Sequence, residues 1–268
     1  MMDKKELQFN NWMKADPLSR KELLLSLEGY KGHDFKLKSV QTFNSNQKEF
    51  TTGIYELGGE EYLFVPGNRV VLGWDEAYPV EEAVLAALQY EMDIAGIPMP
   101  AQEYLKEVCY PIREVEISPM LVERNVCLMN SDSTWVNYNE VIGLFDQQGF
   151  SMVTEDEWEY LCGAELGALF SLPMDSWIHK ICSQESYFWN TPVAEQPNAY
   201  GLHIAYDPYI YELVDAPCIA KGGDGGGASH GGFIFWACCP FLPTTGMRVS
   251  RILWLTGLLT VMFMRGVW

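Results

Sequence analysis

The sequence predicts an α+β fold, because helical and strand-like patterns alternate along the chain. Apolar residues recur at helical spacing in residues 1–31 and 79–110. Residues 33–75 and 113–135 instead carry strand-like runs. The segment from Pro197 to Arg251 differs from both, because aromatic residues flank its dense run of glycines. Glycine beside bulky aromatics indicates close backbone approach in a packed, irregular fold rather than a flexible linker.

Composition and charge narrow the class of protein. Of the 268 residues, 48% are apolar and 13% aromatic, which suffices for a sizeable core and argues against wholesale disorder. The formal net charge of −18 argues against a nucleic-acid partner, because phosphate binding needs clustered Lys and Arg. The charge is also uneven, since the chain after Asp224 carries three arginines and no acidic residue.

The first residues and the cysteines indicate a cytoplasmic protein. Residues 1–9 are charged and lack the apolar run of a secretory signal, so none is expected. Buried thiols are expected rather than disulfides, and the absence of a Cys-x-x-Cys pair argues against a zinc site of the usual spacing. The seven cysteines are Cys109, Cys127, Cys162, Cys182, Cys218, Cys238 and Cys239.

Capping and turn residues predict the first elements. Asp16 followed by Pro17 is typical of a helix start, and Gly29 is expected to end that helix. The pair Gly58-Gly59 separates two strand-like runs, residues 54–57 and 60–65, and predicts a hairpin. After the break at Pro66-Gly67, residues 69–74 predict a further strand.

The middle of the chain predicts helices and strands in alternation. A helix is expected from Pro79 to Gly96, and a second, shorter helix is expected to begin at Pro100. The apolar faces of these helices are typical of core, with partner binding as the alternative. Strands follow in residues 113–135, and two patterns that resemble capping boxes, at Asn137 and Thr154, each predict a helix start.

The segment Val153–Tyr160 resembles the Leu-Pro-Thr-Glu-x-Glu-Trp-Glu-Tyr signature of the formylglycine-generating enzyme/sulfatase-modifying factor family. Further segments are similar to other motifs of that family and follow its order: Val65-Pro66-Gly67 with Leu72-Gly73, Pro197–Leu202, Lys221–Asp224 and Gly246–Val249. The resemblance covers residues 65–250. It implies a C-type-lectin-like fold with much irregular chain, short twisted strands and two helices.

The resemblance does not by itself predict the family's oxidase chemistry, because function depends on the residues of the site. In the family's oxidases two cysteines a few residues apart bind copper(I) and activate oxygen, as suits soft thiolates. The matching segment here, residues 228–236, contains no cysteine. Cys238 and Cys239 lie later and are adjacent, so on a strand they would point to opposite faces. They are the only catalytic candidates, and copper is not expected.

The resemblance also implies calcium ligands. Asn198 and Glu212 match two positions of the family's calcium sites, and oxygen ligands are what calcium needs. However, residues 207–213 are one residue longer than the family's Gly-Asn-Val-Trp-Glu-Trp and lack its Gly-Asn turn. The alternative is that Asn198 caps a turn and Glu212 contacts backbone or an arginine. The four histidines are isolated, which argues against the family's iron branch with its His-x-x-x-His-x-Glu ligand set.

The apolar tail after Arg251 has three interpretations. Its largely apolar run, residues 252–264, is 13 residues long, which is shorter than the roughly 20 that cross a bilayer. The tail could be a final strand or helix buried in this domain, a segment buried against a partner or second copy, or a membrane-interface segment. Membrane association is the least expected of these. The predicted division is residues 1–60 as a helical and hairpin extension, 61–251 as the family-like domain and 252–268 as the tail.

The sequence therefore predicts a non-catalytic binding or scaffold protein whose fold presents a face to a protein or small-molecule ligand. Rigid aromatics among glycines suit such a face. Its expected residues are Trp189, Tyr206, Tyr209, His230, Phe233, Phe235 and Trp236. The alternatives are a copper-dependent oxidase that converts a cysteine in a protein substrate to formylglycine, and a subunit that forms homo- or hetero-oligomers through residues 252–268.

Overall fold

The structure is a computed structural model and has an α+β architecture, as the sequence predicts. It describes residues 5–45, 48–77, 80–125, 127–129, 138–163, 197–204, 211–217, 219–222, 247–248, 261–263 and 265–267. Within these residues no helix combines the length and the apolar composition needed to cross a bilayer.

The N-terminal half begins with helices α1 (Phe9–Lys14) and α2 (Pro17–Ser26) and a 3₁₀ turn at Tyr30–Gly32. The Asp16 side chain accepts hydrogen bonds from the backbone N–H groups of Leu18 and Ser19, at 2.9 and 3.0 Å, which confirms the predicted cap. Strands β1 (Lys36–Ser45), β2 (Lys48–Leu57), β3 (Glu60–Val65) and β4 (Asn68–Leu72) follow. The β2–β3 hairpin is confirmed as well: Leu57 pairs with Glu60, and both intervening glycines have positive φ.

The rest of the chain alternates helices with short strands. The helix expected from Pro79 begins three residues later, as α3 (Glu82–Ala95), and α4 (Ala101–Val108) follows it. The remaining elements are β5 (Arg113–Ile117), β6 (Met120–Glu123), β7 (Cys127–Met129), α5 (Tyr138–Gln148), β8 (Ser151–Met152), α6 (Glu155–Leu161), β9 (Tyr211–Leu213), β10 (Ile219–Gly222), β11 (Met247–Arg248), β12 (Val261–Phe263) and β13 (Arg265–Val267).

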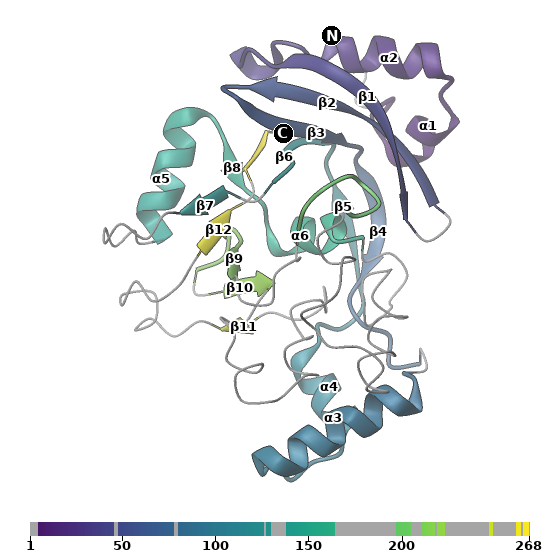
Figure 1. The fold of residues 1–268 in the computed structure, drawn as a ribbon, viewed down its shortest axis with the longest axis vertical. Coiled ribbons are helices and arrows are strands. Elements are labelled where there is room, and N and C mark those ends of the chain that lie inside the picture. The colour runs from purple at the N-terminus through teal and green to yellow at the C-terminus, as the bar shows by residue number, and fades with distance from the viewer. Residues whose placement is uncertain are drawn as a thin grey trace.

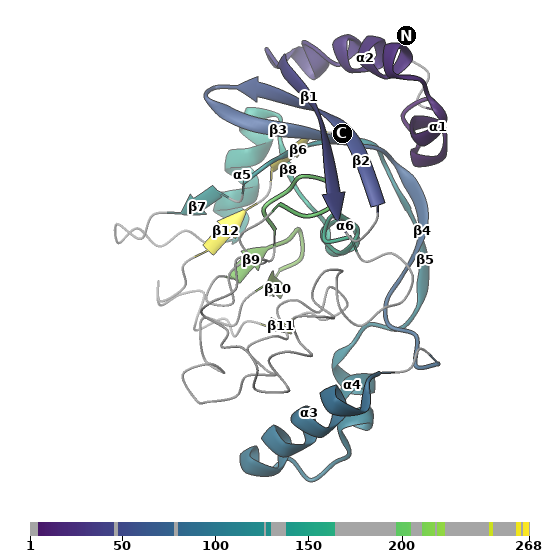
Figure 2. The same cartoon turned by 45° about the vertical axis from the view of Figure 1, so that its right-hand side comes forward.

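The described strands form three sheets. The largest is antiparallel throughout, with the order β1-β2-β3-β6-β13-β8, and the second has the order β11-β10-β9-β12-β7 with one parallel pair, β9–β12. Strands β4 and β5 form a ribbon of their own. In both views α2 lies above the long strands β1–β3 and α1 lies to their right, α6 lies below them, and α3 and α4 lie at the far end of the ribbon (Figures 1 and 2).

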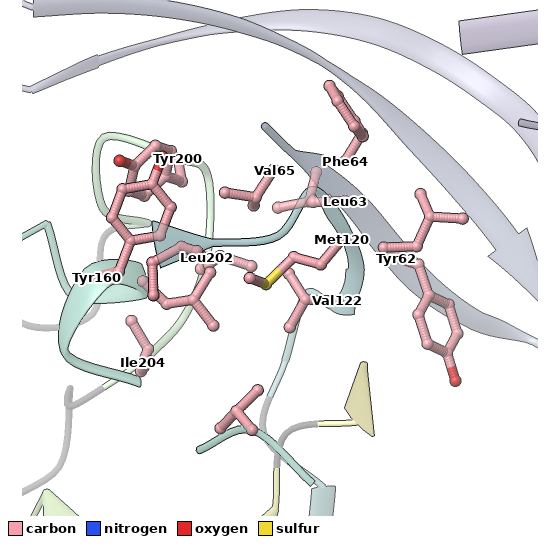
Figure 3. Close-up of a cluster of buried hydrophobic side chains, with 14 of the residues drawn as sticks. Tyr62, Leu63, Phe64, Val65, Met120, Val122, Tyr160, Tyr200, Leu202 and Ile204 are labelled. Atoms are coloured by element: carbon pink, nitrogen blue, oxygen red, sulfur yellow. The ribbon is translucent and has the colours of Figure 1, made fainter. Parts of the chain in front are cut away.

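The core lies between the largest sheet and α6. Side chains of β3 and β6 meet those of α6 and of residues 200–204, as Figure 3 shows for Leu63, Val122, Tyr160 and Leu202. The N-terminal helices share this core, because Trp12 and Leu24 are fully buried in the same cluster. Several of its aromatic pairs meet edge to face, for example Trp12 and Phe64 with ring centroids 4.8 Å apart.

Candidate functional site

Helix α6 carries acidic side chains that face the ribbon. Its start is fixed by the capping box predicted from the sequence: the Glu157 amide donates to Thr154 Oγ1 at 3.3 Å, and the Thr154 amide donates to Glu157 Oε2 at 2.8 Å. Residues three apart on a helix share a face. Asp156 and Glu159 are therefore presented together to strand β5, which α6 contacts.

Arg113 of β5 joins these two carboxylates. Its Nη2 donates to Asp156 Oδ1 at 2.6 Å and to Glu159 Oε2 at 2.7 Å, and its Nε donates to Asp156 Oδ1 at 2.8 Å. The Glu159 side chain is fully buried, whereas that of Asp156 is 41% exposed. Burial raises the pKa of Glu159, although Arg113 and a backbone amide oppose that shift. Arg113 therefore bonds one buried carboxylate, Glu159, and one partly exposed carboxylate, Asp156.

The second oxygen of Glu159 is held by strand β4. Glu159 Oε1 accepts from the Gly73 amide at 2.6 Å, just after β4 ends. Gly73 has φ of +95°, and a Cβ there would lie 2.2 Å from the carbonyl oxygen of Pro111. Only glycine fits this close approach, so the contact depends on the Leu72-Gly73 motif singled out in the sequence.

Lys221 of β10 lies near the same Tyr110 ring as Arg113. It is only 2% exposed, and its Nζ is 4.5 Å from the centroid of the Tyr110 ring and 3.8 Å from Glu155 Oε2. The Tyr110 hydroxyl donates to the same Glu155 oxygen. Burial lowers the pKa of Lys221 to about 8, against the opposing effect of the nearby carboxylates. We call Tyr110, Arg113, Glu155, Asp156, Glu159 and Lys221 the buried polar cluster.

The low pKa of Lys221 predicts a specific pH dependence of stability. Between pH 8 and 10.5 the unfolded chain keeps the lysine protonated while the folded chain releases the proton. The unfolding free energy of the wild type, relative to Lys221→Met, should therefore rise with pH in this window by about 1.4 kcal/mol per pH unit. Urea unfolding of both proteins at several pH values from 7 to about 9.5 checks this.

Methionine matches the length of the lysine stem, so the variant controls for other groups that titrate in the same range. Below pH 8 both states of the wild type carry the charge, and the difference between the two proteins should be constant. A difference that stays flat from pH 8 upward would show that Lys221 has an ordinary pKa.

Glu212 is held by α6 as well. The Trp158 indole Nε1–H donates to Glu212 Oε2 at 2.6 Å, and both side chains are buried. Glu212 of β9 lies directly opposite Lys221 of β10 in the antiparallel ladder. Directly opposed residues face the same side of a sheet, so the carboxylate and the ammonium both meet the Trp158 face of α6.

Asn198 organises the turn at residues 197–202. Its Oδ1 accepts from the backbone amides of Tyr200 and Leu202 at 3.0 and 3.1 Å, and its Nδ2 donates to the Leu161 carbonyl at 2.6 Å. Both lone pairs of Oδ1 therefore have donors. The Asn198 amide also donates to the Leu202 carbonyl at 2.9 Å, which closes the turn. The turn is thereby tied to the C-terminal end of α6.

The two residues matched to calcium positions thus both contact α6. Asn198 caps a turn, as the alternative interpretation expects, and Glu212 accepts a hydrogen bond from the Trp158 indole. In the part of the chain that is described, no group of three or more His, Cys, Asp or Glu lies together as a metal site requires. Calcium at these positions remains a prediction, and binding at Asn198 Oδ1 would compete with the two backbone amides that it accepts from.

The other residues expected at a site lie outside the described residues. These are the aromatic and histidine residues Trp189, Tyr206, Tyr209, His230, Phe233, Phe235 and Trp236, and the thiols Cys238 and Cys239. Of the remaining cysteines, Cys109 and Cys162 are buried, as expected. Burial raises the pKa of the Cys162 thiol well above its ordinary value, which keeps it neutral and unreactive.

The family-like motifs meet around α6. Tyr160 donates its hydroxyl to the Pro66 carbonyl at 3.1 Å, and Glu159 accepts from Gly73. Asn198 bonds Leu161, and Lys221 faces Glu155. Met247 and Arg248 extend the sheet by pairing with β10. Five segments spread over residues 65–249 therefore contact one helix or the sheet beside it.

Sequence reasoning singled out these segments but missed the buried polar cluster that joins them. Arg113 was read only as the start of a strand, and nothing local to it indicates two carboxylates 43 and 46 residues away. One signal was present: Glu155 and Glu159 are four apart, so they share a face of the predicted helix, and a buried carboxylate requires a cationic partner. The two basic residues of the neighbouring segments, Arg113 and Lys221, supply them.

Comparison of the chain with protein-family models, with curated proteins and with solved structures found no match.

Proposed function

We propose that the protein is a non-catalytic binding or scaffold protein, in which a C-type-lectin-like fold of the formylglycine-generating enzyme kind presents a binding face. The observation that carries the proposal is the meeting of the family-like motifs around α6. Each motif there contributes a contact that holds the frame, such as Tyr160 to Pro66 and Asn198 to Leu161. The short strands β7 to β13 and the helices α5 and α6 also suit this fold.

The polar groups in the frame favour a structural role over a catalytic one. Lys221 has the lowered pKa of a nucleophilic amine, but it is 2% exposed and lies against the Tyr110 and Trp158 rings. A substrate carbonyl cannot reach it in this arrangement. The oxygens of Glu159 and Asn198 are likewise engaged with donors. The absence of cysteine from residues 228–236 removes the pair that the family's oxidases use.

Copper(I) binding distinguishes this proposal from the oxidase alternative. Titration of the full chain with copper(I) in competition with a colorimetric chelator should show no stoichiometric high-affinity site. Oxygen consumption with a cysteine-containing peptide should equal the rate without protein. The Cys238→Ser/Cys239→Ser variant should match the wild type in both measurements, because adjacent residues of a strand point to opposite faces and only a turn before Pro240 would let both thiols ligate one ion. Tight binding that Cys239→Ser abolishes would contradict the proposal.

The binding face is tested by a separate retention experiment with a second variant. Immobilised wild type should retain proteins or small molecules that the Trp189→Ala/Trp236→Ala variant does not, because aromatic anchors dominate binding energy. The cysteine variant serves as the matched control and should retain the same set as the wild type. Equal retention by all three proteins would count against these aromatics as the face.

Assembly through residues 252–268 is less well supported. The described residues of the tail form β12 and β13, whose backbones pair with strands of the same chain. This pairing favours the interpretation of the tail as a final strand of the domain.

A further inference from the structure

Helix α3 is largely apolar, although only part of its surface is buried. Ten of its 14 residues are apolar or aromatic: four alanines, two leucines and one each of valine, methionine, isoleucine and tyrosine. Apolar residues therefore extend beyond the side of α3 that packs against the rest of the chain. Val84, Leu88 and Met92 are buried on one side, at 5% exposure or less.

The opposite side of α3 is exposed to solvent. Ala83, Ala86, Tyr90 and Ile94 recur at spacings of three and four residues and form one stripe, which we call the α3 stripe. Tyr90 is 67% exposed and Ile94 is 59% exposed. These are among the most exposed large apolar side chains in the described part of the chain. An aromatic and a branched aliphatic side chain one turn apart form the kind of anchor pair that dominates helix-mediated binding.

The stripe is presented on a fixed support. Gln89 donates to the Met99 carbonyl and accepts from the Ala101 amide at 2.8 Å, which joins α3 to the start of α4. Gly96 ends α3 with φ of +71° and allows the reversal between the helices. In both views α3 lies at the outermost end of the molecule, beyond the β4–β5 ribbon (Figures 1 and 2). A partner can therefore approach the stripe without meeting the long sheet.

The charge around the stripe selects the class of partner. Residues 75–108 contain eight acidic residues and a single basic one, Lys106. Lys106 Nζ lies 3.1 Å from Glu76 and 3.5 Å from Glu103, so its charge is already countered. Glu82 and Asp93 are exposed on α3 itself, next to the stripe. A second copy of this chain and an anionic membrane would each bring like charge to this surface.

We propose that the α3 stripe docks an amphipathic helix of a partner protein, whose apolar face covers Tyr90 and Ile94 and whose flanks carry Lys and Arg. The apolar contact supplies the affinity, and the acidic rim selects a basic helix and orients it. The proposal concerns α3 (Glu82–Ala95) and does not rest on the binding face proposed above. A test of the α3 stripe can therefore give either result whether or not the proposed binding face is correct.

The test uses two labelled helical peptides of about 18 residues, or five turns. Both carry leucine at helical spacing on one face, and the polar face is lysine in one and glutamate in the other. Fluorescence anisotropy with the full chain should show saturable binding of the lysine peptide only. Tyr90→Ala/Ile94→Ala should weaken it about tenfold or more, because truncation of central anchors costs more than 1 kcal/mol each. Val71→Ala/Ile112→Ala, which truncates two exposed apolar side chains in and beside the ribbon, should bind as the wild type does.

Three results would overturn the proposal. The first is an absence of saturable binding of the lysine peptide. The second is equal weakening by the two double variants, which would mean that the peptide only senses overall negative charge. The third is a dimer in light scattering that Tyr90→Ala/Ile94→Ala converts to monomer, which would assign the stripe to a second copy of this chain.

Discussion

Deletion of residues 261–268 should abolish cooperative folding. Strand β12 lies between β9 and β7, and β13 lies between β6 and β8, so these residues supply an inner strand to each of the two larger sheets. Their removal leaves β7 and β8 without the partners that they have here and opens four strand edges. Unpaired inner edges promote aggregation. We expect the truncated protein to elute in the void volume of a gel-filtration column and to lack a sharp urea transition.

A substitution in the full-length chain isolates the backbone contribution of the same strand. Met262 pairs with Leu128 on one side and with Glu212 on the other. Met262→Pro removes a backbone N–H from an inner strand and should destabilise the protein by about 3 kcal/mol or more. Met262→Ile keeps the N–H and a similar volume, and should cost less than about 1.5 kcal/mol.

These results also distinguish a structural role of the tail in the domain from a role in binding a partner. A soluble truncated protein with the wild-type transition would show that β12 and β13 contribute little to the fold. The tail would then be free to act as a segment that binds a partner. Failure of the truncated protein together with a stable Met262→Ile variant would instead assign the tail to the domain itself.

Local signals predicted the elements well where a single residue type decides the geometry. Asp16 caps α2, Gly58 and Gly59 make the hairpin turn, and Thr154 caps α6, as expected. Boundaries were less certain, because helix α3 begins at Glu82 and not at Pro79. Caps and turns depend on a few neighbouring residues, which is why the sequence alone reveals them.

Pairing between distant segments could not be predicted in the same way. The strand pattern of residues 113–135 does not show that β5 joins β4 while β6 joins β3 and β13. Likewise, the apolar run of the tail is compatible with a strand or a helix, because short apolar runs lack a decisive period. The parallel pairing of β12 with β9 joins residues about 50 positions apart, and only tertiary packing selects it.

The contacts of the buried polar cluster also join distant segments, so the sequence could not predict them. Substitution of one of its residues, Glu159, has the second large expected effect on stability. Glu159→Ala should lower the unfolding free energy by about 3 kcal/mol or more. The substitution removes the buried partner of Arg113 and leaves the Gly73 amide without an acceptor. An unpaired buried N–H alone costs about 1–3 kcal/mol. Urea unfolding at pH 7, with the slope of the transition held equal between proteins, measures the change.

The neighbouring ion pair supplies a matched control for Glu159→Ala. Asp156 bonds the same Arg113 but is 41% exposed, so Asp156→Ala should cost less than about 1 kcal/mol. Glu159→Gln should fall between the two, because its amide oxygen can still accept from Gly73 while the charge is lost. If Glu159→Ala and Asp156→Ala destabilise equally, burial of Glu159 is not what holds α6 against the ribbon. If Glu159→Ala is much the worse, the buried carboxylate of Glu159 is what holds α6 against the ribbon.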